Sequence, residues 1–300
     1  MSSIKGTYAI ADAYVNPYVM KAVGAYFYFA GGVSGYPAPD ATLCRSDGTP
    51  GGTAPVKPWA PEVVPLQPYD LTPMGGSLYF AGTTFARGAE LWRLIDASPP
   101  SFALVEDINP VQYPDGTGGG SAPMELKAIG GFLYFSANDG VRGRELWRSD
   151  GDFDTRLVKD LNPSGHSDPS QFTSLGGKVL FAADDGANGR ELWVTDGTEE
   201  GTRMLKDIRL AGGSDPWQLT AVPGGKVVVF STDDGVHGRE LWITDGTEEG
   251  TRLLQDIAHG STASNPIANG FAYVPFPISG GHVFFTAQTA AEGQELWAVP

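Results

Sequence analysis

Several features that define common classes of protein are scarce or missing in this chain. A single cysteine, Cys44, excludes an internal disulfide, and the chain has 20 Lys and Arg against 35 Asp and Glu. The formal charge of −15 argues against a nucleic-acid partner, because phosphate backbones are bound by clustered basic residues. No apolar run reaches the about 20 residues that a membrane-spanning helix requires, so membrane insertion is not expected.

The first residues show no basic segment followed by an apolar one, which is the pattern of a secretory signal. Either such a segment has been removed or Met1 is the natural start, and the residues leave both alternatives open. The residues alone therefore do not predict the protein's location.

Local signatures of catalysis are also missing. The chain has no G-x-S-x-G, H-E-x-x-H, G-x-x-x-x-G-K or CxxC motif, and its four histidines share no metal-ligand spacing. Carboxylates gathered from distant repeats would leave no local motif, however. A hydrolase or lyase therefore stays open as an alternative.

What the chain does contain is a recurring Glu-Leu-Trp motif. It occurs five times, and Thr42-Leu43-Cys44 is a decayed sixth copy; the complete copies begin at Glu90, Glu145, Glu191, Glu240 and Glu295. Successive copies lie 48, 55, 46, 49 and 55 residues apart, a period typical of solenoids, arrays and propellers.

Each repeat contains four short apolar or alternating runs and no sustained helical period. Gly-Gly, Asp-Asp-Gly and Asp-Gly-Thr separate the runs, and these residues favour tight turns. The sequence therefore predicts an all-β protein with four antiparallel strands, a to d, in each propeller blade.

The two ends of the chain predict how the blades are joined. The last copy stops after its third strand, while Gly6–Asp12 matches the strand d residues Gly250–Asp256 at equal offsets. We expect one domain, residues 1–300, that forms a closed six-bladed β-propeller whose last blade is completed by the N-terminal strand. The expected blades are about 14–62, 63–109, 120–163, 167–209, 214–258, and 270–300 with 5–13.

The pattern G-R-E-L-W-x-T-D-G-T-x-x-G-T, complete at Gly189–Thr202 and Gly238–Thr251, resembles the bacterial ELWxxDGT-repeat family over nearly the whole chain. Blade 3 departs from it after Gly151, blade 2 loses the Asp-Gly-Thr turn, and blade 6 ends before that turn. The resemblance implies a propeller, often within a secreted or cell-surface protein. It transfers no catalytic residue.

Residues that recur in every blade are expected to build the scaffold. The repeated tryptophans are predicted to fill the space between neighbouring blades. If strands c and d pair with Thr195 opposite Thr202, Glu191 faces Lys206, and the same register gives opposite charges in other blades.

The candidates for binding are aromatic residues that interrupt the repeat, namely Trp59, Tyr69, Tyr113 and Trp217. They lie in irregular connections or at the start of strand a, and loops on a rigid scaffold are common binding sites. Their chemistry suits a carbohydrate, and it suits a protein surface equally. The alternative is that those on strand a only cap the core.

Four aspartates are candidate metal ligands: Asp168, Asp185, Asp215 and Asp234. They occupy the b–c loops and d–a connections, which are predicted to share one end of the blades. Carboxylate oxygens clustered there suit Ca²⁺. The alternative is that they only form turns, and no EF-hand spacing is present.

These observations favour a non-catalytic recognition module that binds a carbohydrate, as a lectin does, or a partner protein through the b–c and d–a loops. The alternatives are a hydrolase or lyase with carboxylates at the mouth of the propeller channel, and a structural or assembly component. The ligand and the oligomeric state are not predicted.

Overall fold

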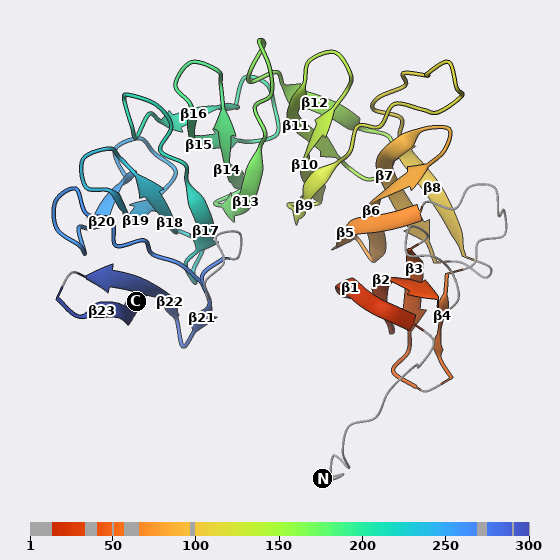
Figure 1. Ribbon diagram of the computed structural model, residues 1–300, viewed down its shortest axis with the longest axis horizontal. Helices are drawn as coiled ribbons and strands as arrows, with labels where there is room; N and C mark the ends of the chain where they lie inside the picture. The colour runs from red at the N-terminus through yellow and green to blue at the C-terminus, as the bar shows by residue number, and fades with distance from the viewer. Residues whose placement is uncertain are drawn as a thin grey trace, which may run out of the picture. The chain divides into compact units, whose positions relative to one another are not determined.

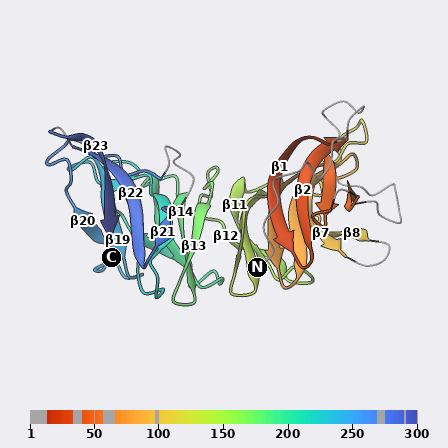
Figure 2. The same ribbon diagram turned by 90° about the horizontal axis from the view of Figure 1, so that it is seen from below.

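The computed structural model describes residues 14–33, 41–49, 51–56, 66–96, 100–268, 275–289 and 291–299. In these residues 23 β-strands form six antiparallel sheets (Figures 1 and 2). No helix in the described segments is long and apolar enough to cross a membrane. The described chain is therefore all-β.

The chain divides into two compact units. The first comprises Met1–Leu133, Asn138–Gly140 and Ser149–Thr155, and the second comprises Tyr134–Ala137, Val141–Arg148 and Arg156–Pro300. One sheet contributes residues to both units.

Two four-stranded sheets belong wholly to the first unit, and in each the strands pair in the order of the sequence. The strands are β1 (Tyr14–Val23), β2 (Tyr26–Val33), β3 (Thr42–Ser46), β4 (Thr53–Pro55), β5 (Leu66–Met74), β6 (Ser77–Thr84), β7 (Gly88–Ile95) and β8 (Ser101–Glu106).

The third sheet, which is shared by the two units, has the same consecutive strand order. It consists of β9 (Met124–Ile129), β10 (Phe132–Asn138), β11 (Arg144–Ser149) and β12 (Thr155–Lys159).

The second unit holds two further four-stranded sheets and one three-stranded sheet, again in consecutive order. Their strands are β13 (Ser170–Leu175), β14 (Lys178–Asp184), β15 (Arg190–Thr195), β16 (Arg203–Lys206), β17 (Trp217–Ala221), β18 (Val228–Asp233), β19 (Arg239–Thr244), β20 (Arg252–Gln255), β21 (Ile278–Ser279), β22 (His282–Thr289) and β23 (Gly293–Val299).

The closed six-bladed propeller predicted from the sequence is wrong. The six sheets are separate, and in the described residues the last one contains three strands, β21, β22 and β23. Residues 5–13, which were expected to supply that strand, lie outside the described residues. The match of Gly6–Asp12 to strand d is a local pattern of turn and strand residues, and such a pattern does not specify which sheet edge the segment joins.

Large apolar side chains fill the interior of each unit. In the second unit Leu180, Leu192, Phe230 and Trp242 belong to one buried cluster. Four of the five repeated tryptophans are buried, as expected for scaffold residues, namely Trp92, Trp147, Trp193 and Trp242, whereas Trp297 is half-buried.

The glutamate of the repeated motif is the polar exception in this interior. The side chains of Glu90, Glu145, Glu191 and Glu240 are each 0% exposed. The Glu191 carboxylate accepts hydrogen bonds from the backbone N–H of Ile208 (3.1 Å) and Arg209 (3.3 Å). It also accepts from the N–H (2.9 Å) and the hydroxyl (2.6 Å) of Ser214. The carboxylate thus joins the end of β16 to the connection that leads into the next sheet.

Three other sheets repeat this arrangement with different serines. Each glutamate accepts both the N–H and the hydroxyl of one serine; the pairs are Glu90 with Ser121, Glu145 with Ser167, and Glu240 with Ser264. Burial raises the pKa of Glu90 to about 7, against the lowering effect of its hydrogen bonds to Ser121, Asn109 and Ile108. Burial likewise raises the pKa of Glu145 and of Glu191. A carboxyl enclosed in this way cannot contact a substrate.

The predicted pairing of Glu191 with Lys206 is wrong. Strands β15 and β16 begin in the expected register, since the hydroxyls of Thr195 and Thr202 lie 2.7 Å apart. An irregularity then places Lys206 opposite Leu192, so Glu191 turns to backbone donors. The Lys206 ammonium instead donates to the carbonyl of Thr251 (2.7 Å) in the neighbouring sheet. One extra residue in a strand changes every pairing beyond it.

The enclosed carboxylate is expected to be important for stability. Replacing Glu191→Gln keeps the shape but puts an amide NH₂ against backbone donors, which should lower the free energy of unfolding by about 2–3 kcal/mol. Chemical denaturation of the two proteins at the same pH measures the loss.

The matched control is Glu295→Gln, because Glu295 holds the same position in the last sheet but is exposed. It should change the free energy of unfolding by less than about 0.5 kcal/mol. Equal losses for the two variants would contradict a special role for the buried carboxylate.

Truncation of a scaffold tryptophan tests the interior separately. Trp193 is buried, and its ring stacks on that of Phe181 with centroids 6.4 Å apart. Trp193→Ala should therefore cost about 3–5 kcal/mol, as large-to-small changes in a core do. A loss below 1 kcal/mol in thermal or chemical unfolding would show that this position is not part of the core.

Candidate functional site

The b–c loops and the d–a connections meet at one end of the sheets. In the second unit Gly189, with φ of 77°, lies so near Gly213 that an added Cβ would stand 2.4 Å from its nitrogen. A Cβ on Gly186 would meet the side chain of Asn162 at 2.6 Å. The first unit shows the same approach between Gly88 and Gly120. These close approaches explain why glycines occur in these loops. We call this end of the sheets, formed by the b–c loops and the d–a connections, the loop end.

Two of the candidate metal ligands form the turns of the b–c loops. The Asp185 carboxylate accepts the N–H of Ala187 (2.9 Å) and of Asn188 (2.7 Å). The Asp234 carboxylate accepts the N–H of His237 (2.8 Å), and its other oxygen lies 2.7 Å from His237 Nδ1. Both carboxylates are thus engaged with their own loops.

The other two candidates, Asp168 and Asp215, precede the first strands of their sheets with positive φ values of 44° and 49°. Their carbonyls accept hydrogen bonds from the guanidinium groups of Arg190 (2.7 Å) and Arg239 (2.9 Å). Within the described residues no three His, Cys, Asp or Glu side chains come together as a metal site. The structure therefore does not gather the four aspartates around a common point.

The aromatic candidates are placed very differently from one another. Trp217 is half-buried, and the Arg239 guanidinium lies 4.8 Å from its ring centroid, so this ring face is covered. Tyr69 is half-buried in β5, whereas Tyr113 is exposed. Tyr69 and Tyr113 belong to the first unit and Trp217 to the second, while Trp59 lies outside the described residues.

Sequence reasoning missed the exposed apolar residues at the loop end. In the second unit Val141 is 84% exposed, Leu210 is 89% exposed and Val236 is 64% exposed. In the first unit Phe85, Val111 and Tyr113 are exposed in the corresponding loops. A signal was present in the repeat, because Val141 and Val236 both stand four residues before the motif glutamate.

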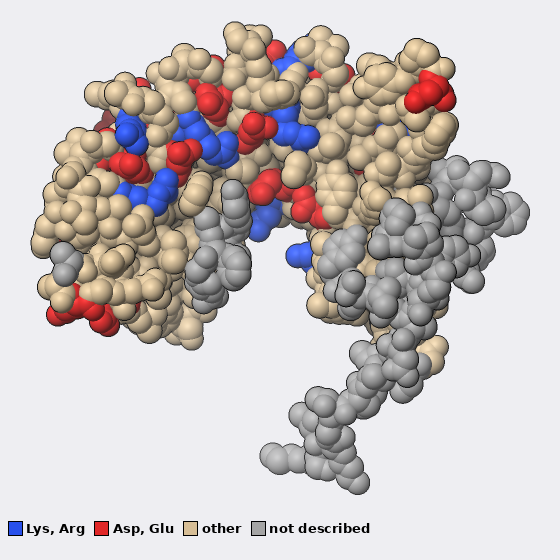
Figure 3. Space-filling view, in the orientation of Figure 1, with Lys and Arg blue, Asp and Glu red and all other residues tan. Residues whose placement is uncertain are grey.

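Charged residues of both signs are interspersed over the surface of β13 to β20 (Figure 3). At the loop end they form pairs: Arg209 lies 3.0 Å from Asp233, and Arg87 pairs with Asp107 in the first unit. Opposite charges therefore offset one another beside the apolar loop residues.

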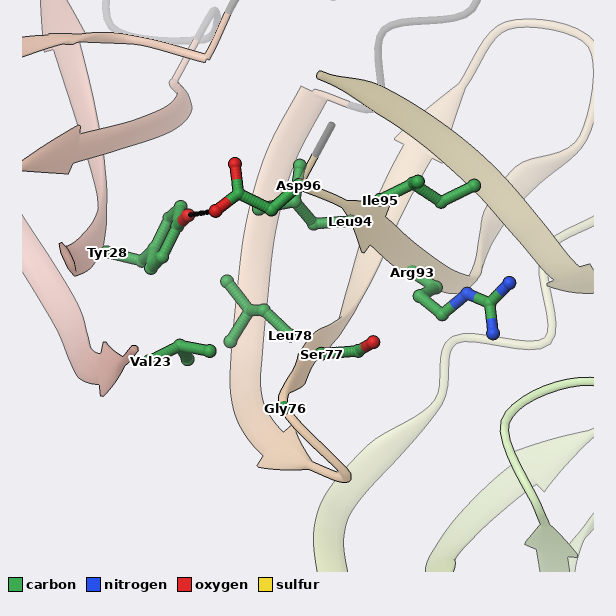
Figure 4. A pocket seen from close by; sticks show the side chains of 9 residues that line it. All are labelled: Val23, Tyr28, Gly76, Ser77, Leu78, Arg93, Leu94, Ile95 and Asp96. Atoms are coloured by element: carbon green, nitrogen blue, oxygen red, sulfur yellow. Dashed lines mark hydrogen bonds between the residues drawn. The ribbon is translucent and has the colours of Figure 1, made fainter. Parts of the chain in front are cut away.

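A cavity of about 330 Å³ lies in the first unit, away from the loop end (Figure 4). Its wall includes Tyr28, whose hydroxyl donates to Asp96 (3.1 Å), together with Val23, Leu78 and Leu94. Burial and the Asp96 carboxylate raise the pKa of Tyr28 to about 12.

The cavity lies where the second repeat lacks the Asp-Gly-Thr sequence that other repeats have after their third strand. In the third sheet, Gly151 of the corresponding turn lies against Tyr79, and an added Cβ would be 2.2 Å from the tyrosine oxygen. The second sheet has Asp96 after β7 at this place, and space remains beside Tyr28. The cavity is thus a consequence of a changed turn.

Comparisons with known proteins show the fold and no more. No protein-family model and no curated protein matches the chain. A puromycin-hydrolyzing peptidase from Mycobacterium tuberculosis is 12% identical with a TM-score of 0.53, over 95% of this chain and 44% of the peptidase.

TolB from Acinetobacter baumannii is 13% identical with a TM-score of 0.41, over 76% of this chain and 50% of TolB. A puromycin hydrolase is 17% identical with a TM-score of 0.37, over 97% of this chain and 52% of the hydrolase. The chain spans about half the length of these structures. Together with the repeated sheets, the peptidase likeness supports a β-propeller-like fold.

The pair of His237 and Asp234 makes a prediction about pH. The hydrogen bond to Asp234 raises the pKa of His237 above its ordinary value. The pairing therefore stabilises the loop fully below the ordinary histidine pKa of about 6.5, and this contribution is lost as the pH rises through the raised value. NMR titration of the His237 ring should show the raised pKa.

Asp234→Asn is the test of this cause, because it removes the charge and keeps the shape. The pKa of His237 should return toward its ordinary value in this variant. An unaltered His237 titration would show that Asp234 does not control it.

Proposed function

We propose that this chain is a non-catalytic recognition module that binds a partner protein through its loop end. The observation that carries the proposal is the exposure of Val141, Leu210 and Val236 on loops of the second unit. Exposed apolar groups bordered by polar residues are a feature of protein interaction sites, and Leu210 and Val236 are the two whose loop segments meet. Gly235 approaches Arg209, so the loop segments that bear Val236 and Leu210 are in contact.

Two features favour a protein over a carbohydrate as the ligand. Sugars pack on flat, open aromatic rings, whereas the exposed residues of the second unit are aliphatic and the Trp217 ring is covered by Arg239. A protein partner can bury exposed apolar groups of any shape, and such groups on a soluble protein mark interaction sites. The first unit differs, because Phe85 and Tyr113 expose aromatic rings in its loops.

A catalytic role finds less support. Four described carboxyls have raised pKa values. Glu90, Glu145 and Glu191 are enclosed and hydrogen-bonded to backbone donors, and the half-buried Asp70 accepts the backbone N–H of Glu125. Membership of the ELWxxDGT-repeat family remains a part of the proposal, and it rests on the repeated motif alone.

Site-specific photo-crosslinking in the native cell tests this function. A photoreactive residue at Leu210 should capture a defined partner protein, because this side chain projects from the loop end. With that partner purified, Val236→Asp and Leu210→Asp should each weaken binding at least tenfold, or about 1.4 kcal/mol. Thermal unfolding should stay unchanged, since both side chains are exposed.

Phe153→Asp is the matched control, because Phe153 is equally exposed but lies in a c–d turn. It should leave the affinity unaltered. Binding that depends on Phe153, or that maps to the Asp196 and Asp245 turns, would contradict the assignment to the loop end. Specific retention on a glycan array without a protein partner would favour the carbohydrate alternative.

A further inference from the structure

In the last sheet the motif Glu-Leu-Trp on β23 is more exposed than the same motif in the other sheets. Leu296 is 71% exposed, while its counterparts in four other sheets are 0–1% exposed; these are Leu91, Leu146, Leu192 and Leu241. Glu295 is exposed, whereas the four corresponding glutamates are enclosed. Among the described residues β23 pairs only with β22, so its second edge has no strand beside it (Figure 1).

The four four-stranded sheets that carry the motif glutamate show what chemistry belongs at this edge. In the fifth sheet β20 pairs with β19, placing Leu253 opposite Trp242 and Arg252 opposite Ile243. The chain then reaches the buried Ile257, whose N–H donates to Glu240 (3.1 Å). Ile108, Leu161 and Ile208 are buried in the same way and donate to their own motif glutamates. A fourth strand at this edge therefore supplies apolar side chains and, just after its end, an aliphatic residue whose backbone N–H donates to the motif glutamate.

The edge of β23 is also suited to pairing by its regularity. Seven consecutive residue pairs join β22 to β23 without a bulge, from Thr289–Gly293 to Val283–Val299. The segment Gly293–Val299 contains neither lysine nor proline, the residues that commonly block edge-to-edge pairing. Two acidic residues, Glu292 and Glu295, are exposed here, and acidic atoms gather at this place in Figure 3.

We propose that the free edge of β23 binds an extended segment of a partner protein by antiparallel strand addition. The segment that fits has the pattern of this chain's own outer strands, Thr-Arg-x-Leu-x-Asp-Ile or a close variant. The residue between its arginine and its leucine lies opposite Trp297, as Leu253 lies opposite Trp242. The backbone N–H of its final isoleucine donates to the Glu295 carboxylate, as that of Ile257 donates to Glu240. Main-chain hydrogen bonds supply the affinity and the apolar positions supply the specificity.

This surface is independent of the loop end. It lies on a strand edge, it recognises an extended backbone, and its partner is defined by sequence pattern. Failure of one proposal therefore leaves the other untouched.

The test uses the full chain and a synthetic peptide with the sequence of Gly250–Ile257, GTRLLQDI. Calorimetric titration should show saturable binding with one peptide per chain. Amide hydrogen exchange should slow at Gly293–Val299 when the peptide is present. A scrambled peptide and a peptide with proline in place of its first leucine should bind at least tenfold more weakly.

Leu296→Asp in the full chain should also weaken peptide binding at least tenfold without a change in melting temperature, since Leu296 is exposed. Val141→Asp, an equally exposed apolar site on a loop, should leave peptide binding unaltered. The proposal is overturned by absence of binding, by equal binding of the scrambled peptide, or by indifference to Leu296→Asp. It is also overturned if the β23 amides of the full chain are already fully protected, because the edge is then covered without a partner.

Discussion

A buried carboxylate that accepts backbone hydrogen bonds is the interaction that ties each of four motif-bearing sheets to the connection that follows it. The motif glutamate on the third strand of a sheet holds the end of the fourth strand, and it also holds a serine in the connection that follows. Burial of a charged group is costly unless donors surround it, and here backbone N–H groups and a serine hydroxyl do so. The same carboxylate thus satisfies buried backbone groups that would otherwise lack partners.

Much of the architecture can be predicted from the repeat, because strands and turns are specified locally. Alternating runs and Gly- or Asp-containing turns gave four strands for each of five repeats, and recurrence pointed to the tryptophans as scaffold. Closure of the ring is not local information: the resemblance of Gly6–Asp12 to strand d carries no information on which edge it meets. The pairing of Glu191 with Lys206 failed for a similar reason, because one irregularity between β15 and β16 changed the register.

The candidate site shows the same limit. Trp217 interrupts the repeat, yet the adjacent Arg239 covers its ring, and the sequence places these residues 22 positions apart without indicating contact. Asp185 and Asp234 suit a metal by residue type, but each is occupied by the turn it forms. Exposed valines at the loop tips were overlooked because an apolar residue in a repeat is normally assigned to the core. Packing thus constrains the residue type at each scaffold position, while the residue type at the loop tips is not constrained in this way.

The hydrogen bonds of the motif glutamate extend past the four strands of its sheet, so the structural unit includes the connection that follows them. Glu191 lies on β15, but the serine that completes its shell is Ser214, eight residues beyond the end of β16. A fragment cut at the end of β16 would retain the carboxylate and discard all of its donors, which belong to Ile208, Arg209 and Ser214. Boundaries for fragments, fusions or circular permutants of this chain therefore belong after the serine, so that each piece keeps the counterpart of every charge it encloses.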